Sequence, residues 1–393
     1  MTMQPPSTRK LNLAELNRLG RSVGTAARVL RGRRTDPGYA APVPEEVGVQ
    51  LTYRCNLRCT SCFQWSETGF FHRLGQQQAR GELAPEVFEK LLFQTREARS
   101  NLYLWGGEPL VHRQWNELSR MLERDPRWTV ICTNALMIER SLESLLRLSE
   151  NLVLLISIDG LREQNDANRG HGTFEKIIAA VTLIARLKER GEYRGKLSLS
   201  LVLSDENVPT LYEFCDYCAG LPGIDSLYLV YPWYISASVA AAMDDYYEAQ
   251  LAWLNPPPAA GSASWHSYTH HLSPASIGVL REQVAKIAAQ AWDIRIRFQP
   301  AMDGEELAGF ILGSARPAQG RSQCLALSSR LDVLADGTVS ACKLFPELAV
   351  GNLNEQELAE IWHSERFRRV RGLVSGGLMP ICSKCVLLYL HGA

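Results

Sequence analysis

Three cysteines lie close together near the start of the chain, at the spacing Cys55-x-x-x-Cys59-x-x-Cys62. Three thiolates on one short loop can bind three irons of a [4Fe–4S] cube and leave the fourth iron open to another ligand. A zinc site would need a fourth protein ligand nearby, and a disulfide would leave one thiol over. The spacing therefore predicts a chemical site on this loop.

A second group of four cysteines lies near the other end of the sequence. Its members are Cys324, Cys342 and the Cys-x-x-Cys pair Cys382 and Cys385. Asp336-Gly337, between two apolar runs just before Cys342, is a hairpin-turn signal. Four thiols in a segment that carries a strand–turn–strand pattern indicate a second metal site.

The remaining three cysteines are expected to pack in the core. Cys215 and Cys218 share one apolar helical face with Leu211, Phe214 and Leu221. Cys132 ends a predicted strand beside the predicted pocket. We expect it to pack there as well.

Short apolar, β-branched runs alternate with helical stretches from residue 47 onward, and this pattern must position the cysteines. Candidate strands cover 47–53, 101–105, 129–133, 152–158, 196–203 and 226–231, and helices cover 85–99, 115–124, 141–149, 173–190 and 208–219. Strand–helix repeats predict an α/β fold with a parallel sheet curved into a partial (β/α)6 barrel. In barrels of this kind the chemistry gathers on the loops after the strands. The first cysteine loop follows the first strand.

Four segments follow from this pattern. Residues 1–45 form a basic amphipathic helix and a proline-rich linker, 46–235 the barrel, 236–315 a helical connecting region, and 316–393 a small cysteine-ligated α+β module. Between residues 9 and 34 eight basic residues accompany one acid, Glu15. We expect this helix to pack outside the barrel with its basic face in solvent. Peripheral contact with an anionic membrane is the alternative.

The composition restricts the class of partner and the cellular compartment. The 393 residues are 46% hydrophobic with a formal net charge of zero, which gives no general case for nucleic-acid binding. The sequence shows neither a secretion-signal pattern nor a bilayer-length apolar run. These features predict a cytoplasmic protein whose ten cysteines stay reduced.

Further motifs follow the next three predicted strands. They are Trp105-Gly106-Gly107-Glu108-Pro109, Cys132-Thr133-Asn134 and Ser157-Ile158-Asp159-Gly160, with Asp166, Arg169, Gly172 and Phe174 after the last. Together with the cysteine loop, this order resembles that of the radical S-adenosylmethionine (SAM) enzymes. The resemblance covers residues 47 to about 231.

The resemblance implies roles for individual residues. Cys55, Cys59 and Cys62 would hold the SAM-binding [4Fe–4S] cluster, reduced by a flavodoxin- or ferredoxin-type donor. The loop of Gly106, Gly107 and Glu108 would bind the methionine amino group of SAM. The other implied SAM contacts are Arg169 at the methionine carboxylate, Ser157, Asp159 and Asn134 near the ribose and carboxylate, and Phe63 beside the adenine.

The C-terminal cysteines resemble those of the SPASM and twitch modules. By this resemblance Cys324, Cys342, Cys382 and Cys385 would hold a second, auxiliary [4Fe–4S] cluster with all four irons ligated. A full SPASM module carries more cysteines than this segment has. A zinc ion with four thiolate ligands is the alternative.

The resemblance implies an enzyme that makes a 5′-deoxyadenosyl radical and abstracts hydrogen from its substrate. We expect a small-molecule or carbohydrate-like substrate, because about 45 residues before the barrel are too few for a leader-peptide domain. We also expect net oxidation through the auxiliary cluster. The alternatives are a peptide maturase, an epimerase, a decarboxylase or a carbon–carbon bond-forming enzyme with a structural cluster, and a non-catalytic redox sensor. Tyr231, Trp233 and Tyr234 would lie at the pocket rim, as packing or as substrate contacts.

Overall fold

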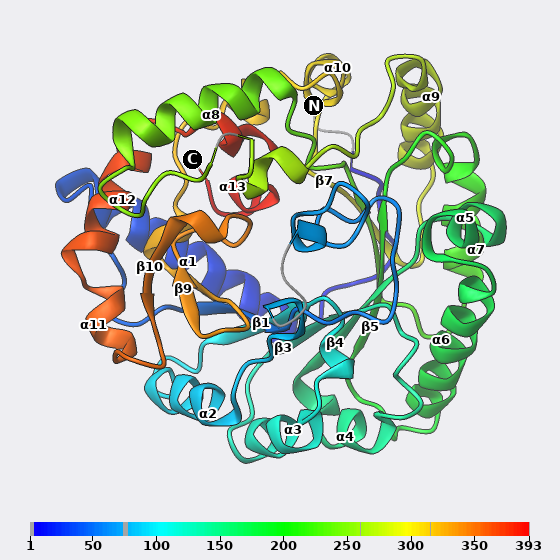
Figure 1. Ribbon diagram of the computed structural model, residues 1–393. Coiled ribbons are helices and arrows are strands. Elements are labelled where there is room, and N and C mark those ends of the chain that lie inside the picture. Colours follow the sequence, from blue (N-terminus) through cyan, green and yellow to red (C-terminus); the bar gives the residue numbers. More distant parts are fainter. Residues whose placement is uncertain (1–3, 74–77, 260, 315, 393) are drawn as a thin grey trace.

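One sheet of ten strands organises the computed structural model, which describes residues 4–73, 78–259, 261–314 and 316–392 (Figure 1). The strand order is β10-β9-β8-β1-β2-β3-β4-β5-β6-β7. Neighbouring strands from β1 to β7 are parallel. Their bounds are β1 Glu46–Thr52, β2 Asn101–Gly106, β3 Thr129–Thr133, β4 Leu152–Ser157, β5 Lys196–Val202, β6 Ser226–Val230 and β7 Arg295–Gln299.

The six predicted strands are confirmed as β1 to β6, and the sheet extends past them at both edges. At one edge β7 pairs with β6, although a long segment separates the two in sequence. At the other edge β8 (Arg330–Val333) pairs in parallel with β1. Strands β9 (Thr338–Ser340) and β10 (Ala349–Asn352) continue antiparallel from β8. The C-terminal cysteine segment is therefore continuous with the barrel sheet.

Helices cover the outer face of the curved sheet (Figure 1). The apolar residues of each helix face the strands, as Leu118, Met121 and Leu122 of α3 do. On α7, Cys215 and Cys218 are buried in the core, which confirms the packing role predicted for them. The outer helices are α2 Pro85–Gln94, α3 Trp115–Arg124, α4 Leu142–Arg147, α5 Arg162–Arg169, α6 Thr173–Glu189, α7 Leu211–Gly220 and α9 Ser276–Ala289.

The C-terminal part of the chain adds a layer of helices around β8 to β10. Helix α8 (Ala237–Gln250) lies against the turn Pro380–Lys384, which carries Cys382. Helix α12 (Glu365–Gly376) buries Phe367, Val370 and Val374. The others are α10 Gly304–Ile311, α11 Leu358–Trp362 and α13 Val386–His391.

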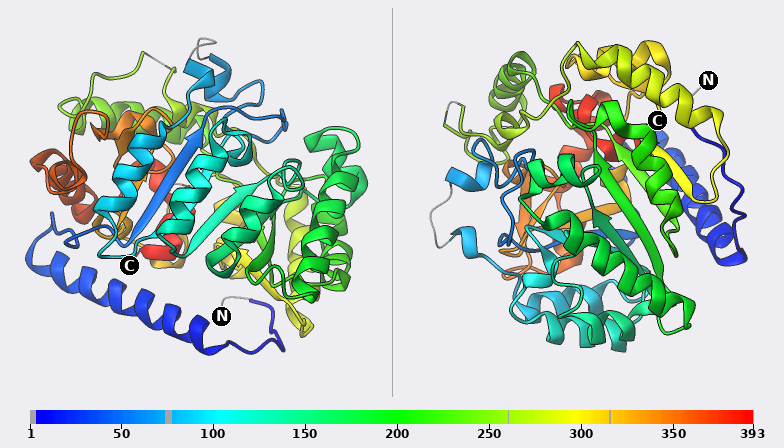
Figure 2. Two further views of the ribbon diagram at one scale, coloured as in Figure 1. Left: turned by 90° about the horizontal axis from the view of Figure 1, so that it is seen from below. Right: turned by 90° about the vertical axis from the view of Figure 1, so that its right-hand side faces the viewer.

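Helix α1 (Leu13–Thr35) runs along the outside of the molecule, beneath the sheet (Figure 2, left). Glu15 pairs with Arg295 at 2.9 Å and with Lys196 at 3.1 Å, at the start of β7 and β5. Arg18 lies 3.7 Å from the ring centroid of Trp128. Arg33 is buried and donates to Ser328 at 2.7 Å. Several charged side chains of α1 therefore face the protein.

Several apolar side chains in the first half of α1 face solvent, whereas Val29 is buried. The exposed fractions of Leu13, Leu19 and Val23 are 75%, 55% and 61%. Arg21, Arg31 and Arg34 are exposed as well, so apolar and basic side chains share the solvent side of the helix. Ion pairs of Glu15, the hydrogen bond of Arg33 and the buried side chain of Val29 attach the helix to the protein. Among the described residues no helix has the length and apolar character needed to span a membrane.

Candidate active site

The loop after β1 carries the three closely spaced cysteines. Cys55, Cys59 and Cys62 are half-buried free thiols. Burial, with a smaller contribution from the neighbouring thiols, raises the pKa of Cys55 to about 12 and that of Cys59 to about 11. Thiols bind metal as thiolates, so binding here would release protons. Three soft sulfur donors on one loop fit the open iron–sulfur cluster that the spacing predicts.

The glycine loop after β2 rests directly on the cysteine loop. The Gly107 N–H donates to the Thr52 carbonyl at 2.8 Å, and the Glu108 N–H donates to the Arg54 carbonyl at 2.8 Å. A Cβ atom on Gly107 would lie 2.2 Å from the Arg54 oxygen, and one on Gly106 would lie 2.5 Å from the Thr52 oxygen. Only glycine permits this approach of two backbones.

Glu108 is buried and its carboxylate binds other parts of the protein. It accepts hydrogen bonds from the Thr133 hydroxyl at 2.7 Å, the Asn134 N–H at 2.7 Å and the Leu110 N–H at 3.1 Å. Burial raises its pKa. The side chain thus joins the loops after β2 and β3.

Asn134 directly follows β3, and Ser157 is the last residue of β4. The Asn134 side chain donates to Asn56 at 2.7 Å and lies 4.0 Å from the Cys55 sulfur. The structure therefore brings Asn134 to the cysteine loop. The Ser157 hydroxyl lies 4.0 Å from the sulfur of Cys132, which is half-buried.

Asp159 and Arg169 pair with each other. The Arg169 Nε lies 2.7 Å from the Asp159 Oδ2, and both side chains are buried. Burial alone would lower the pKa of Arg169, but the charges of Asp159 and Cys59 raise it overall. The two residues expected to contact SAM thus form one ion pair close to the cysteine loop.

Asn168 attaches helix α5 to the cysteine loop, a role that no motif in the sequence indicates. Its side-chain oxygen accepts from the Thr60 hydroxyl at 2.6 Å and the Ser61 N–H at 3.0 Å. Its amide nitrogen donates to the Ser61 hydroxyl at 3.0 Å and to Asp159. The neighbouring Asp166 instead holds the turn into α6 by accepting from the Gly172 and Phe174 N–H groups.

Phe63 belongs to an aromatic cluster beside the cysteine loop. It stacks on Tyr268 at a centroid distance of 4.7 Å and lies 5.8 Å from Trp233. Tyr231 is buried and packs against Phe298 and Phe310, so it serves as core. Tyr234 stacks on His271. Of the three predicted rim residues, Trp233 is the one in contact with Phe63.

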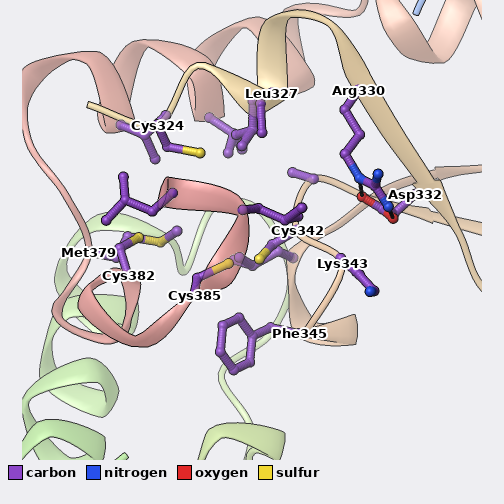
Figure 3. A pocket seen from close by; sticks show the side chains of 17 residues that line it. Cys324, Leu327, Arg330, Asp332, Cys342, Lys343, Phe345, Met379, Cys382 and Cys385 are labelled. Atoms are coloured by element: carbon purple, nitrogen blue, oxygen red, sulfur yellow. Dashed lines mark hydrogen bonds and ion pairs between the residues drawn. The ribbon is translucent and has the colours of Figure 1, made fainter. Parts of the chain in front are cut away.

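The four C-terminal cysteines line one cavity (Figure 3). Cys324 precedes β8, Cys342 follows β9, and Cys382 and Cys385 lie on and after the turn Pro380–Lys384. Burial raises the pKa of each thiol, and nearby thiol charge adds to this for Cys342, Cys382 and Cys385. The rest of the lining is largely apolar, including Leu327, Phe345 and Met379. Four convergent thiols in an apolar cavity fit a fully ligated cluster.

In the described ranges, no group of three or more His, Cys, Asp or Glu side chains forms a site for a single metal ion. Neither cysteine set is arranged as a site for a single metal ion. The feature that the two sets share is their thiol donors.

Two family models match the chain. The Radical SAM superfamily model matches residues 49–218, and the SPASM model, an iron–sulfur cluster-binding domain, matches residues 324–386. The first match contains the loops after β1 to β4, and the second contains all four C-terminal cysteines. The second match favours iron–sulfur over zinc for that set.

Curated relatives support both matches. The tungsten-containing aldehyde ferredoxin oxidoreductase cofactor-modifying protein of Pyrococcus furiosus is 23% identical over 352 residues, 86% of each chain. The mycofactocin maturase MftC of Mycolicibacterium smegmatis is 30% identical over 171 residues, 43% of this chain and 40% of MftC.

The fold is also that of a solved structure. SuiB of Streptococcus suis, bound to precursor peptide SuiA, superposes with a TM-score of 0.58 at 15% identity, covering 93% of this chain and 74% of SuiB. At that identity the likeness shows the fold alone. It agrees with the partial barrel and C-terminal module predicted from the sequence.

Proposed function

Because the chain is a radical SAM enzyme with a C-terminal SPASM domain, we propose that it abstracts hydrogen from a substrate inside the barrel and oxidises it. When bound, the three-cysteine cluster and SAM supply a 5′-deoxyadenosyl radical, and the four-cysteine cluster supplies an acceptor for one electron. The substrate loses one hydrogen atom, then one electron and one proton. The chain's own residues bind and orient the reactants.

The observation that carries the proposal is the placement of the two cysteine sets. Cys55, Cys59 and Cys62 follow β1, and β8, which pairs directly with β1, lies between Cys324 and Cys342. A substrate bound between the two cysteine sets could lose a hydrogen atom to the radical made at the three-cysteine set and an electron to the cluster at the four-cysteine set. This arrangement favours oxidation over a purely structural second cluster.

We assign positioning roles around SAM to the residues that meet at the first set. The backbone of Gly106 and Gly107 is close enough to the cysteine loop to face a ligand bound there. Arg169, oriented by Asp159, supplies positive charge for a carboxylate. Asn134 and Ser157 supply polar groups, and Phe63 supplies an aromatic face for the adenine.

The substrate class has two candidates. The Pyrococcus furiosus relative, which matches 86% of this chain, is named as a cofactor-modifying protein, and this supports a small-molecule substrate. SuiB bound to a precursor peptide and the maturase MftC support a peptide. We place the small molecule first, with a flavodoxin- or ferredoxin-type protein as electron donor. Turnover assays with a small molecule and with a peptide distinguish the two candidate substrate classes.

Anaerobic reconstitution tests the proposal. The ligand count predicts about eight irons per chain, and reduction in the presence of SAM should release 5′-deoxyadenosine. Cys59→Ala should abolish that release. Cys215→Ala removes a core thiol outside both sets, and as the matched control it should keep the irons and the release. Release that persists in Cys59→Ala, or about four irons with stoichiometric zinc, would refute the assignment.

One observation favours a second candidate reaction. Cys132 is half-buried, and its sulfur lies 4.0 Å from the Ser157 hydroxyl. A thiol placed there could return a hydrogen atom to a substrate radical, as an epimerase requires. In D₂O that reaction would put deuterium into the product, and Cys132→Ser would prevent it. Oxidation without deuterium incorporation excludes this candidate.

A further inference from the structure

Lys343 follows Cys342, yet its side chain points away from the four sulfurs (Figure 3). Only 8% of its surface is exposed. Among the described residues no side chain or carbonyl forms a hydrogen bond or ion pair with its ammonium group. The nitrogen itself keeps some contact with solvent, so a ligand can reach it.

Aromatic rings are the close neighbours of this ammonium. Its nitrogen lies 4.2 Å from the ring centroid of Tyr103, 5.1 Å from that of Trp105 and 5.8 Å from that of Trp233. Ring faces attract a cation but do not neutralise its charge.

The nearby carboxylate of Asp332 is already engaged. It accepts from Arg330 Nη2 at 2.7 Å and from Arg330 Nε at 3.0 Å, and both side chains are buried. Arg330 also reaches Glu46 at 3.3 Å. The positive charge of Lys343 therefore has no anion in contact with it in the described part of the chain.

Three buried N–H donors around Lys343 also lack acceptors. They are the indole nitrogens of Trp105 and Trp233 and the side-chain amide nitrogen of Gln50. Gln50 on β1 is the register partner of Trp105 on β2, so the two side chains lie on the same face of the sheet. Buried donors in folded proteins are nearly always paired. An acceptor group from outside the chain would pair these donors.

These residues lie between the two cysteine sets. Trp233 contacts Phe63, the neighbour of Cys62, and Trp105 directly precedes Gly106. Lys343 itself is the neighbour of Cys342. A group bound here would lie beside both sets.

We propose that Lys343, Trp105, Trp233 and Gln50 form a subsite for a carboxylate of the substrate. The inference rests on the proposed function and narrows its substrate to a carboxylate-bearing molecule. A carboxylate offers several acceptor positions, enough for the ammonium and the neutral N–H groups. Its single negative charge matches the single unpaired ammonium, whereas a phosphate would bring more charge than the site can neutralise.

The test uses the reconstituted full chain with SAM, and acetate as the probe. Tryptophan fluorescence should respond saturably to acetate at constant ionic strength and should not respond to the neutral isostere acetamide. Lys343→Met should weaken acetate binding at least tenfold. Lys286→Met, on the exposed surface of α9, is the matched control and should bind acetate like the wild type.

A second pair of variants guards against misfolding. Trp233→Phe keeps an aromatic ring at this position and removes the indole N–H, so it should weaken acetate binding severalfold. Lys343→Arg keeps the charge and should retain the preference for acetate over acetamide. Equal acetate binding in the wild type and Lys343→Met, or no response of the wild type, overturns the subsite.

Two further measurements separate this proposal from its alternatives. If Lys343→Met shifts the reduction potential of the C-terminal cluster and leaves acetate binding unchanged, the lysine acts on the cluster and the subsite is refuted. Release of 5′-deoxyadenosine by the wild type tests the proposed function by itself. Failure of that release with acetate binding retained would refute the function and support the subsite.

Discussion

At Gly107 the loop after β2 meets the backbone of the cysteine loop. Gly107→Ala would place a methyl group 2.2 Å from the Arg54 carbonyl oxygen, and a backbone atom cannot rotate away. We expect a loss of stability of roughly 1–3 kcal/mol and a displaced cysteine loop. SAM binding by equilibrium dialysis should fall at least tenfold.

Gly278→Ala is the matched control for Gly107→Ala. Gly278 lies in α9, and a Cβ atom there would meet nothing within 4 Å. Alanine favours a helix over glycine by roughly 0.5–1 kcal/mol, so this variant should be at least as stable as the wild type. If Gly107→Ala binds SAM as Gly278→Ala does, the close approach is not required.

Individual residues differ in how well the sequence predicts their roles. The seven cysteines and the glycines stand out because few other residue types suit their positions. Asn168 and Lys343 do not stand out, since their roles arise from loops that come from distant parts of the chain. Glu108 was predicted from its motif, but the sequence could not show that its carboxylate faces Thr133 and Asn134.

Among the elements, α1 has an unusual orientation. Leu13, Leu19 and Val23 face solvent beside Arg21, Arg31 and Arg34, which are also exposed. Glu15, the one acid of the helix, is turned inward and paired. We propose that this surface contacts an anionic membrane, because exposed apolar side chains with basic neighbours suit one.

Vesicle flotation tests the membrane contact of α1. The chain should float with phosphatidylglycerol vesicles and stay behind with phosphatidylcholine vesicles. Replacing Leu13, Leu19 and Val23 together by Ser should reduce the bound fraction at least tenfold, since even one buried apolar side chain is worth roughly 1.5–3 kcal/mol. Phe93→Ser, an exposed apolar residue on α2, should bind like the wild type. Equal flotation with both lipids would contradict the proposal.

The helical period of α1 was predictable, and the direction of its faces was not. Periodicity shows that apolar residues share one side, but it does not show whether that side meets protein or solvent. That choice depends on Lys196 and Arg295, which the fold brings beneath the helix.

In the whole molecule, the two cysteine sets share one sheet but no ligand. Cys385→Ala should lower the iron content from about eight to about four per chain, because each set holds its own cluster. Release of 5′-deoxyadenosine should continue, since the first set is intact. Cys218→Ala, a buried core thiol outside both sets, should keep all the irons. Loss of iron from both sites with an unchanged circular dichroism spectrum would show that the sets depend on each other.

The overall architecture was predictable only as far as local repeats extend. Alternating strands and helices predicted β1 to β6. The pairing of β8 with β1 joins residues 284 positions apart, such as Arg330 and Glu46, and no local pattern carries it. Strand β7 follows the two helices α8 and α9, and this long connection interrupts the regular strand–helix repeat.

The pairing of β8 with β1 also has a consequence for synthesis on the ribosome. Strand β1 emerges early, but its second edge stays unpaired until residues 330–333 have been translated. Contacts between segments so far apart form slowly, and an unpaired edge is open to aggregation in the meantime. The cysteine loop after β1 thus gains its final framework only after residues 330–333 have been translated. Iron delivery to that loop is expected to follow the pairing of these two strands.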